Sequence, residues 1–524
     1  MARMGKPRAL LAAVVAASAF QCQAQTAEPL PSGVLDALHF TIAEIRIEGA
    51  TLVPGGRLRD VVRPFLGTSR RLADLTEARQ KILEAYRDAG YELLSVDYDA
   101  SRSRQGVHYF VVREVRLGKV TVTGTASISQ AQVRREIPSL QEGATPPLAR
   151  IARELFLFND NPGRTAGLEY AAGAAGTTDV AIKVAERPQL RGALTYNNTG
   201  TSSTGTSRFG INVAHANLFD RSHQLSGSLT TSDKPSHVTQ AGVGYLVPVP
   251  VWGDSVSLSA GYSKADSGRV ADLFNVAGES TVWGAHYQRN LARDATARHV
   301  LDVGYDERRY RDLVDFFGVN LGTSVTVKAL SAAYRYNGTG AGQAWSFGVV
   351  LQQNLPGGKR NDDATYAASR AGADARWRSW QFDAGWRRDL GGGWEAEARV
   401  AAQYADEPLV AAEQFGLGGL RAVRGFRERD GAGDRGLRAN LELYLPRFAE
   451  SQRLLAFVDA GASRRLNPQP GERAGEGVGS VGIGWRAQFA NGFQGSLDFA
   501  YVTNGTPRQP RGDQMLHAAM AWQF

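Results

Sequence analysis

Alternation between apolar and polar side chains dominates the sequence from Leu190 to Phe524. A period of two residues puts apolar side chains on one face of a β-strand and polar side chains on the other, whereas a helix repeats about every 3.6 residues. Sixteen such segments can be counted, separated by Gly, Asn, Asp and Pro. An even number of antiparallel strands, each about ten residues long, is typical of membrane β-barrels. The sequence therefore predicts an all-β membrane barrel of about 16 antiparallel strands over residues 189–524.

The glycine content agrees with this fold class. Of the 524 residues, 59 are Gly, and they are dispersed rather than clustered. Gly is unfavourable inside helices, so a mainly helical protein is disfavoured. After the first twenty residues, no run approaches the roughly 18 consecutive apolar residues of a membrane-spanning helix. A chain of this kind would cross a membrane with a closed set of strands.

The final segment shows which strand face would meet lipid. Its apolar face holds Leu516, Ala518, Met520, Trp522 and Phe524. A soluble β-sandwich would alternate in the same way, so the connections decide between the two. Long connections at 310–322, 355–373, 407–434 and 465–475 alternate with short turns, as extracellular loops alternate with periplasmic turns in outer-membrane barrels. The chain therefore should enter the first barrel strand and leave the last one on the periplasmic side. The residues that precede the barrel are expected on that side too.

The first 24 residues are typical of a secretory signal peptide. Arg3, Lys6 and Arg8 precede an apolar run, and small residues follow up to Ala24. Three of the eight excess positive charges thus lie in a removed segment, which weakens the case for a nucleic-acid partner. The one cysteine is Cys22, where the preceding residues lack the usual pattern of a lipoprotein signal. The mature chain would therefore hold neither a disulfide nor a cysteine-ligated metal.

An internal repeat lies between a short segment, 25–39, and the predicted barrel. Ile45–Gly49 is echoed by Val120–Gly124, and both are short alternating strands that end at Gly. Each is followed by two stretches with helical spacing and then by two further strands. The sequence therefore predicts two α+β domains with the element order β-α-α-β-β, at residues 40–116 and 117–188.

The longest connection, 407–434, has an unusual composition for a surface loop. Small residues surround a central tetrapeptide of Val423, Arg424, Gly425 and Phe426. A guanidinium flanked by apolar side chains in a confined lumen needs a carboxylate partner, because an unpaired buried charge is costly.

Two later residues could supply that carboxylate. Asp459 shares one strand face with Phe457 and Gly461, opposite an apolar face. If the apolar face meets lipid, Asp459 points into the lumen. Glu442 on the neighbouring strand points the same way and competes as the partner. The sequence leaves the choice between the two carboxylates open.

With these motifs in view, the sequence resembles the TpsB outer-membrane transporters of two-partner secretion, of the haemolysin secretion/activation type within the POTRA-barrel superfamily. The two repeats resemble POTRA domains, and Asn159–Gly163 together with 173–179 resembles the second POTRA domain of these transporters. Val423–Phe426 matches the family's inward-folded loop motif, and Phe457–Gly461 matches its strand motif F-x-D-x-G. The resemblance covers essentially the whole mature chain.

The resemblance implies transport rather than catalysis. The POTRA domains would capture an unfolded exported partner protein in the periplasm, expected to be a large β-helical cargo. The barrel, a monomer in outer-membrane lipid, would conduct this cargo outward without ATP, and Arg424 would bridge to Asp459 to anchor the loop. No cofactor, metal or nucleic acid is implied. Family members often carry a plug helix and a long linker, for which 25–39 is short, since about fifteen extended residues span roughly 50 Å.

Three other functions compete with secretion. An assembly or insertion factor of the same superfamily typically carries three or more POTRA domains, whereas this chain has room for two. A passive porin does not need periplasmic repeat domains. An enzyme would need a catalytic motif, and the sequence has no G-x-S-x-G, H-E-x-x-H or P-loop. Its G-x-G-x-x-G at 477–482 lies within an alternating segment and precedes no helix.

Overall fold

The computed structural model describes residues 39–524, except for 175, 250–252, 271–273, 294–295, 317–318 and 321. The predicted signal peptide, 1–24, and all but the last residue of the segment 25–39 lie outside the described residues. The chain divides into one unit that ends at Arg187 and another that begins at Pro188. Each unit is described by itself.

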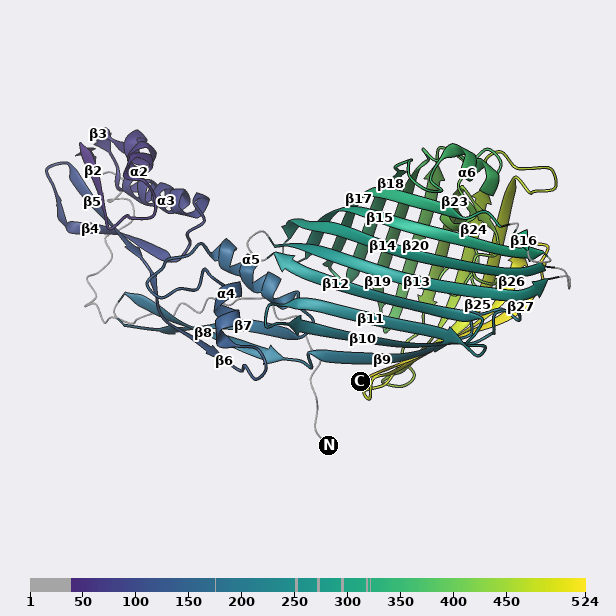
Figure 1. Cartoon of the computed structure of the whole chain (residues 1–524). Coiled ribbons are helices and arrows are strands. Elements are labelled where there is room, and N and C mark those ends of the chain that lie inside the picture. The colour runs from purple at the N-terminus through teal and green to yellow at the C-terminus, as the bar shows by residue number, and fades with distance from the viewer. Residues whose placement is uncertain are drawn as a thin grey trace. The chain divides into compact units, whose positions relative to one another are not determined.

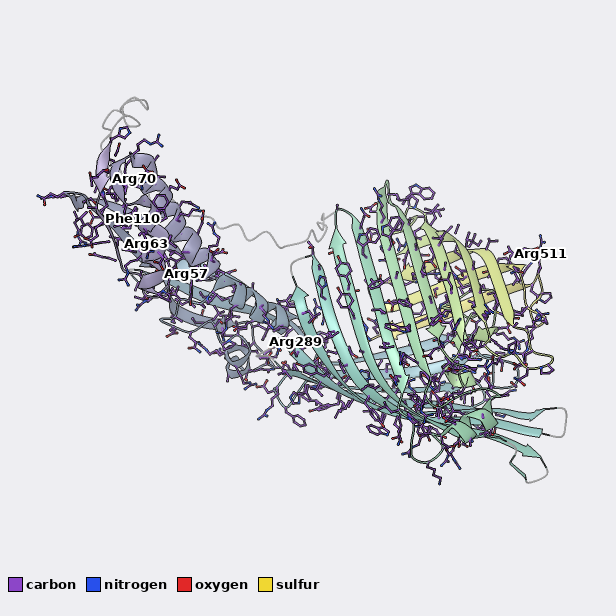
Figure 2. All side chains as sticks on the ribbon, turned by 90° about the horizontal axis from the view of Figure 1, so that it is seen from above. Arg57, Arg63, Arg70, Phe110, Arg289 and Arg511 are labelled. Carbon is purple, nitrogen blue, oxygen red and sulfur yellow. The ribbon has the colours of Figure 1, made fainter. Side chains whose placement is uncertain are left out.

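The first unit opens with an α+β domain whose three-stranded sheet has the order β2-β5-β4. Two short strands, β1 and β3, pair separately and had not been predicted, because three or four residues carry no readable period. Phe110 is fully buried in the core between the sheet and the helices, and Figure 2 labels it with Arg57, Arg63 and Arg70 of the α2–β3 segment. The elements are β1 (Phe40–Ile42), β2 (Glu44–Glu48), α2 (Gly55–Val62), η1 (Arg63–Phe65), β3 (Gly67–Arg70), α3 (Leu72–Asp88), β4 (Leu94–Arg104) and β5 (Val107–Glu114).

The next domain repeats this plan. Its sheet order is β6-β8-β7, with β6 parallel and β7 antiparallel to the central β8. The two helices supply Val133, Ile151 and Phe158 to one buried apolar core. The predicted β-α-α-β-β repeat is therefore present in both domains (Figure 1). The elements are β6 (Arg116–Thr123), α4 (Gln130–Glu136), α5 (Leu148–Asn159), β7 (Arg164–Ala172) and β8 (Thr177–Glu186).

A glutamate at the end of each central strand, β5 or β8, binds the loop that follows β2 or β6. Glu114 accepts hydrogen bonds from the main-chain N–H groups of Thr51 (2.7 Å) and Leu52 (2.9 Å). Glu186 does the same in the second domain, for Ala126 (2.7 Å) and Ile128 (3.0 Å). A carboxylate that accepts several N–H groups satisfies donors that would otherwise lack partners. The repeat thus extends to the hydrogen bonds of its loops.

The second domain is expected to lose stability in acid through Glu186. Partial burial acts to raise its pKa, but hydrogen bonds from the Ser127 hydroxyl and the main-chain N–H groups prevail and lower the pKa to about 2. Because the folded pKa lies below the unfolded one, the stabilisation is present above pH about 4.5 and is lost as the pH falls toward 2. Pepsin cleavage within 117–186 should therefore accelerate over this range. Glu186→Gln should flatten that dependence, whereas Glu169→Gln, in an exposed pair with Lys183, should not.

The second unit is a closed antiparallel barrel in which β27 pairs with β9 (Figure 1). The predicted sixteen-stranded barrel is confirmed, with the two-residue strand β16 (Val319–Asn320) as an addition beside β15. The strands are β9 (Leu190–Asn197), β10 (Arg208–Leu218), β11 (His223–Ser232), β12 (Val238–Val249), β13 (Asp254–Val270), β14 (Phe274–Arg293), β15 (Ala297–Phe316), β17 (Val325–Gly340), β18 (Gln343–Asn354), β19 (Arg378–Gly391), β20 (Trp394–Ala405), β23 (Arg435–Tyr444), β24 (Gln452–Arg464), β25 (Gly475–Gln488), β26 (Phe493–Asn504) and β27 (Gln514–Gln523).

The outer face of the barrel is apolar, as the alternation predicts. On β27, Leu516, Met520 and Trp522 are exposed, whereas His517 is buried. On β23, Leu441 is exposed and Glu442 is buried. Among the helices that the structure describes, none is both long and apolar enough to cross a membrane.

Two predicted connections differ from the structure. The loop expected at 310–322 is largely strand, because β15 continues to Phe316 in register with β14. The connection at 355–373 contains a short helix, α6 (Asp363–Ser369), whose first turn is capped by Asp362 accepting from the Thr365 N–H at 2.9 Å. A helix of two turns is too short to show a clear period in the sequence.

Candidate lumen site

The tip of loop 407–434 packs against the inner wall of the barrel. Val423 and Phe426 are fully buried and form one apolar cluster with Leu417 of the loop and two wall residues, Val478 of β25 and Val502 of β26. Near its root the loop pairs with itself through β21 (Phe415–Gly416) and β22 (Ala432–Gly433). The loop is therefore folded into the lumen and held there by side-chain packing.

Arg424 is the centre of the site. Its guanidinium donates to both carboxylate oxygens of Asp459, from Nε at 2.7 Å and from Nη2 at 2.8 Å, and its main-chain N–H donates to the same residue at 3.1 Å. Nη1 lies 2.7 Å from Glu442 and 3.4 Å from Asp498. The guanidinium carbon lies 3.5 Å from the ring centre of Phe457. The sequence left open whether Asp459 or Glu442 is the carboxylate partner of Arg424, and in the structure Arg424 contacts both.

Two further guanidiniums balance these carboxylates. Arg399 of β20 donates to Glu442 at 2.9 Å, and Arg486 of β25 lies 2.9 Å from Asp498. Three guanidiniums therefore face the three buried carboxylates, and Arg399, which is half exposed, also pairs with Glu397. Buried charges are tolerated when each is paired and hydrogen-bonded in this way. Tyr444 adds a hydrogen bond from its hydroxyl to Glu442 at 2.7 Å.

Both motif glycines lie where a Cβ would be crowded by neighbouring side chains. Gly425 has φ +91°, and a Cβ there would lie 3.3 Å from side chains of Ala500 and Val502. A Cβ on Gly461 would lie 3.2 Å from side chains of Leu417 and Val423 in the loop. Gly461 thus makes the groove in the wall that receives the tip, and Gly425 allows the tip to turn within it.

Sequence reasoning missed three residues that hold the main chain of the tip. Asn440 donates to the carbonyl of Ala422 at 2.7 Å. His517 Nε2 accepts from the Gly425 N–H at 3.0 Å. Gln509 donates to the Gly425 carbonyl at 3.0 Å. Asn440 and His517 lie on the inward faces of their strands, so a search of inward polar residues beside Asp459 could have found them.

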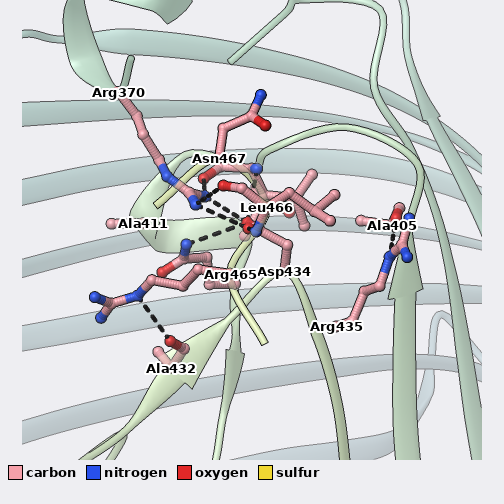
Figure 3. A network of polar contacts seen from close by, with 12 residues as sticks. Arg370, Ala405, Ala411, Ala432, Asp434, Arg435, Arg465, Leu466 and Asn467 are labelled. Carbon is pink, nitrogen blue, oxygen red and sulfur yellow. Dashed lines mark hydrogen bonds and ion pairs between the residues drawn. The ribbon is translucent and has the colours of Figure 1, made fainter. Parts of the chain in front are cut away.

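A second buried network holds the root of the same loop (Figure 3). The carboxylate of Asp434 pairs with Arg370 and accepts from the N–H groups of Leu409 (2.8 Å) and Leu466 (2.7 Å) and from the side chain of Gln414 (3.1 Å). The Asp434 side chain is fully buried. One residue therefore joins three loops, 355–377, 407–434 and 465–475.

The root also contacts the wall at β15. Glu413 accepts from Arg308 at 2.8 Å and from the Tyr310 hydroxyl at 2.8 Å. Because Arg424 is held by β23, β24 and β26, the loop is fixed to two separate parts of the barrel wall. A chain segment fixed at both sides reaches across the interior of the barrel.

A cavity of about 710 Å³ lies beside the docked tip, between Leu420, Arg421 and Glu428 of the loop and wall residues of β9 and β23–β27. Its lining includes Arg421, Arg447, Arg453 and Arg486, against one acidic residue, Glu428. The loop therefore leaves open space beside its tip, and the walls of that space carry more positive than negative charge.

The fold and the site define a class of protein. A closed β-barrel with an apolar belt, a buried lumen loop and N-terminal β-α-α-β-β domains is the architecture of outer-membrane proteins that carry POTRA domains. A family model described as haemolysin secretion/activation protein ShlB/FhaC/HecB matches residues 176–487, and a model of the ShlB-type POTRA domain matches residues 40–107. The chain belongs to the haemolysin secretion/activation family. It is an outer-membrane transporter of the two-partner secretion type.

Curated relatives agree with this family. The chain is 20% identical to the heme/hemopexin transporter protein HuxB of Haemophilus influenzae over 413 residues, which cover 78% of this chain and 73% of the relative. It is 24% identical to the outer membrane transporter CdiB of Dickeya dadantii over 421 residues, which cover 76% of this chain and 71% of the relative.

Solved structures with the same fold include two CdiB proteins. CdiB from Escherichia coli superposes with a TM-score of 0.75 at 18% identity, covering 95% of this chain and 93% of its own. CdiB from Acinetobacter baumannii gives 0.72 at 16% identity, covering 96% and 94%. BamA from Haemophilus ducreyi, lacking POTRA domains 1–3, gives 0.54 at 15% identity, covering 93% and 100%.

Proposed function

We propose that this transporter captures an unfolded exported partner protein in the periplasm and secretes it through the barrel without ATP. The names of its relatives, a heme/hemopexin transporter and outer membrane transporters, support a transport role. We assign 40–116 and 117–188 to the periplasmic receiver and 189–524 to the pore. No enzymatic activity and no cofactor enter this proposal. The observation that carries the capture step is an open sheet edge in the second domain.

The other edge of that sheet, β6, is closed by side chains. The guanidinium of Arg134 donates to the carbonyl of Val120 at 2.6 Å, and the side chain of Gln130 donates to that of Val122 at 3.3 Å. The N–H of Val120 donates to Glu142 at 3.1 Å. A strand whose outward main-chain groups already have partners cannot pair with another chain.

The β7 edge has a cap at its beginning. Asn159 holds both main-chain groups of Ala166, accepting from its N–H at 2.6 Å and donating to its carbonyl at 3.0 Å. Because outward-facing main-chain groups recur every second residue, those of Leu168, Tyr170 and Ala172 face the same side. Among the residues that the structure describes, no cap is seen at these three. This edge supports capture of an extended segment by strand addition.

Tyr170→Pro tests the capture step. Proline removes one outward N–H and is tolerated on an edge strand, so cargo binding should fall while the domain stays folded. The measurement is crosslinking of exported cargo to the full-length transporter, together with the amount of cargo in the medium. Tyr170→Ala keeps the main-chain N–H and should retain most binding. Equal binding by both variants and by the unchanged chain would contradict strand addition at β7.

The cargo proposed is a large exported β-helical protein, and the transporter is proposed to act as a monomer embedded in outer-membrane lipid. The test is to express the transporter with an exported β-helical protein encoded beside it and to measure that protein in the medium. Secretion that depends on the transporter supports the proposal. If its removal instead lowers the levels of unrelated outer-membrane barrels, the assembly role is the correct one. If the protein conducts ions but no secreted protein requires it, it is a passive porin.

A further inference from the structure

The closing strand of the barrel holds the main chain of the motif loop. The Gly425 N–H donates to Nε2 of His517, which lies on β27 and is 3% exposed. Gln509, in the connection leading to β27, grips the same turn, since it donates to the Gly425 carbonyl at 3.0 Å and accepts from the Arg427 N–H at 2.8 Å. These contacts fix the three successive peptide groups that follow Arg424, and none of them involves its guanidinium.

The same part of β27 also closes the barrel against β9. The register there pairs five residues, from Ala519 with Asn197 to Gln523 with Ala193. Beyond these, the Asn198 side chain accepts from the Ala518 N–H at 2.9 Å and donates to the Leu516 carbonyl at 2.7 Å. Asn198 therefore hydrogen-bonds to the residues immediately before and after His517. The motif loop and the end of β9 thus contact β27 at the same three residues, Leu516 to Ala518.

We propose that His517 is a positioning residue that couples docking of the loop tip to closure of the barrel between β27 and β9. When the tip is docked, His517 is held by the loop from the lumen side and its neighbours are held by Asn198 from the seam. Loss of either the Gly425–His517 hydrogen bond or the Asn198 hydrogen bonds leaves β27 with fewer contacts. The seam, which is the pairing of β27 with β9, then opens more often. The coupling rests on the loop-anchoring role that the family resemblance implies for Arg424, and it applies whether or not cargo is present.

The hydrogen bond requires a particular form of His517. Nε2 accepts from an N–H group, so it carries no proton, and the imidazole is neutral with its proton on Nδ1. Charged groups lie near this residue: Asp498 pairs in register with His517 on β26, and Asp498 and Asp459 both pair with Arg424, the residue before Gly425. A side chain that only filled space would not need an acceptor at this point.

The test is hydrogen exchange measured by mass spectrometry on the full-length protein in detergent micelles. His517→Leu should speed exchange roughly tenfold in 190–198 and 514–523, because it removes the acceptor but keeps the bulk. His517→Gln should restore slow exchange, since its side-chain oxygen can accept the same hydrogen bond. Met515→Leu, on the same face of β27 but outside the residues that pair with β9, is the control and should leave the seam unchanged.

Two further variants distinguish coupling between loop and seam from a local disturbance of β27 by the His517 substitution itself. Arg424→Ala releases the tip without altering β27 and should also speed exchange at the seam. Because coupling is reciprocal, Asn198→Ala should speed exchange in 420–430 of the loop. Unchanged seam exchange in both His517→Leu and Arg424→Ala, with the loop released, would overturn the proposal. Cargo is absent from this measurement, so its failure is distinct from a failure of secretion.

Discussion

Replacing Arg424 with alanine is expected to abolish most secretion while the barrel still inserts into the outer membrane. The side chain is 3% exposed and pairs with Asp459, Glu442 and Asp498. Its removal leaves carboxylates uncompensated in a confined space, which costs about 3–5 kcal/mol for a buried pair. The barrel has its own strand ladder and apolar belt, so the loss should fall on the position of the loop. Cargo in the medium should drop by roughly tenfold or more.

The loss of secretion on replacing each carboxylate should depend on how many other partners hold that part of the network. Asp459→Ala should resemble Arg424→Ala, because Asp459 accepts two side-chain hydrogen bonds from Arg424 and its main-chain one. Glu442→Gln should cost less, since Arg399 and Tyr444 also bind Glu442 and can hold an amide in place. Arg424→Lys should fail nearly as badly as alanine, because an ammonium group can neither bind Asp459 through two nitrogens nor stack on Phe457.

The measurement compares cargo in the medium with the amount of transporter that shows heat-modifiable mobility in the outer membrane. Full secretion by both Arg424→Ala and Asp459→Ala would show that the anchored tip is not needed for transport. Loss of the folded barrel in both variants would show that the network serves assembly of the barrel rather than secretion. Only folded transporter with little secreted cargo agrees with the role proposed for the loop.

Much of this molecule could be predicted from local patterns. Alternation predicted all sixteen long strands of the barrel, because lipid on one side and a polar lumen on the other impose a strict period of two. It placed the ends of β13 and β15 too early, since both strands continue beyond the predicted segments. The same parity predicted that Asp459 and Glu442 point inward, which their burial bears out. Short elements were missed, such as α6 and β3, because they bury too few residues to leave a period in the sequence.

Contacts between distant strands could not be predicted in this way. Asp498, Arg486 and His517 join the site because of the register of β25, β26 and β27, and a slip of two residues would keep the alternation but move each side chain along the wall. The bond between Arg370 and Asp434 spans 64 residues and joins two loops. The sequence pattern specifies which side chains point inward, but it does not specify the strand register that makes inward charges on different strands neighbours.

Asp434→Ala is expected to release the extracellular loops. Its carboxylate is fully buried and binds Arg370, while two main-chain N–H groups, those of Leu409 and Leu466, also donate to it. Alanine would leave two N–H groups unsatisfied and the Arg370 charge without its carboxylate, although Arg370 would still donate to the carbonyls of Leu409 and Leu466. Removing one partner of a buried ion pair costs about 3–5 kcal/mol. Proteinase K added to intact cells should then cut 355–377 and 407–434 much faster than in the unchanged protein.

Arg376→Ala is the control, because Arg376 lies in the same loop as Arg370 and pairs with Asp363 at the surface, where its side chain is 68% exposed. Exposed pairs contribute about 0–1 kcal/mol, so proteolysis should hardly change. The tip network around Arg424 shares no residue with Asp434, so a protease-sensitive Asp434→Ala transporter could still keep its tip docked and its barrel folded. If Asp434→Ala resists proteinase K as well as Arg376→Ala does, the root network is dispensable and the tip alone holds the loop across the lumen.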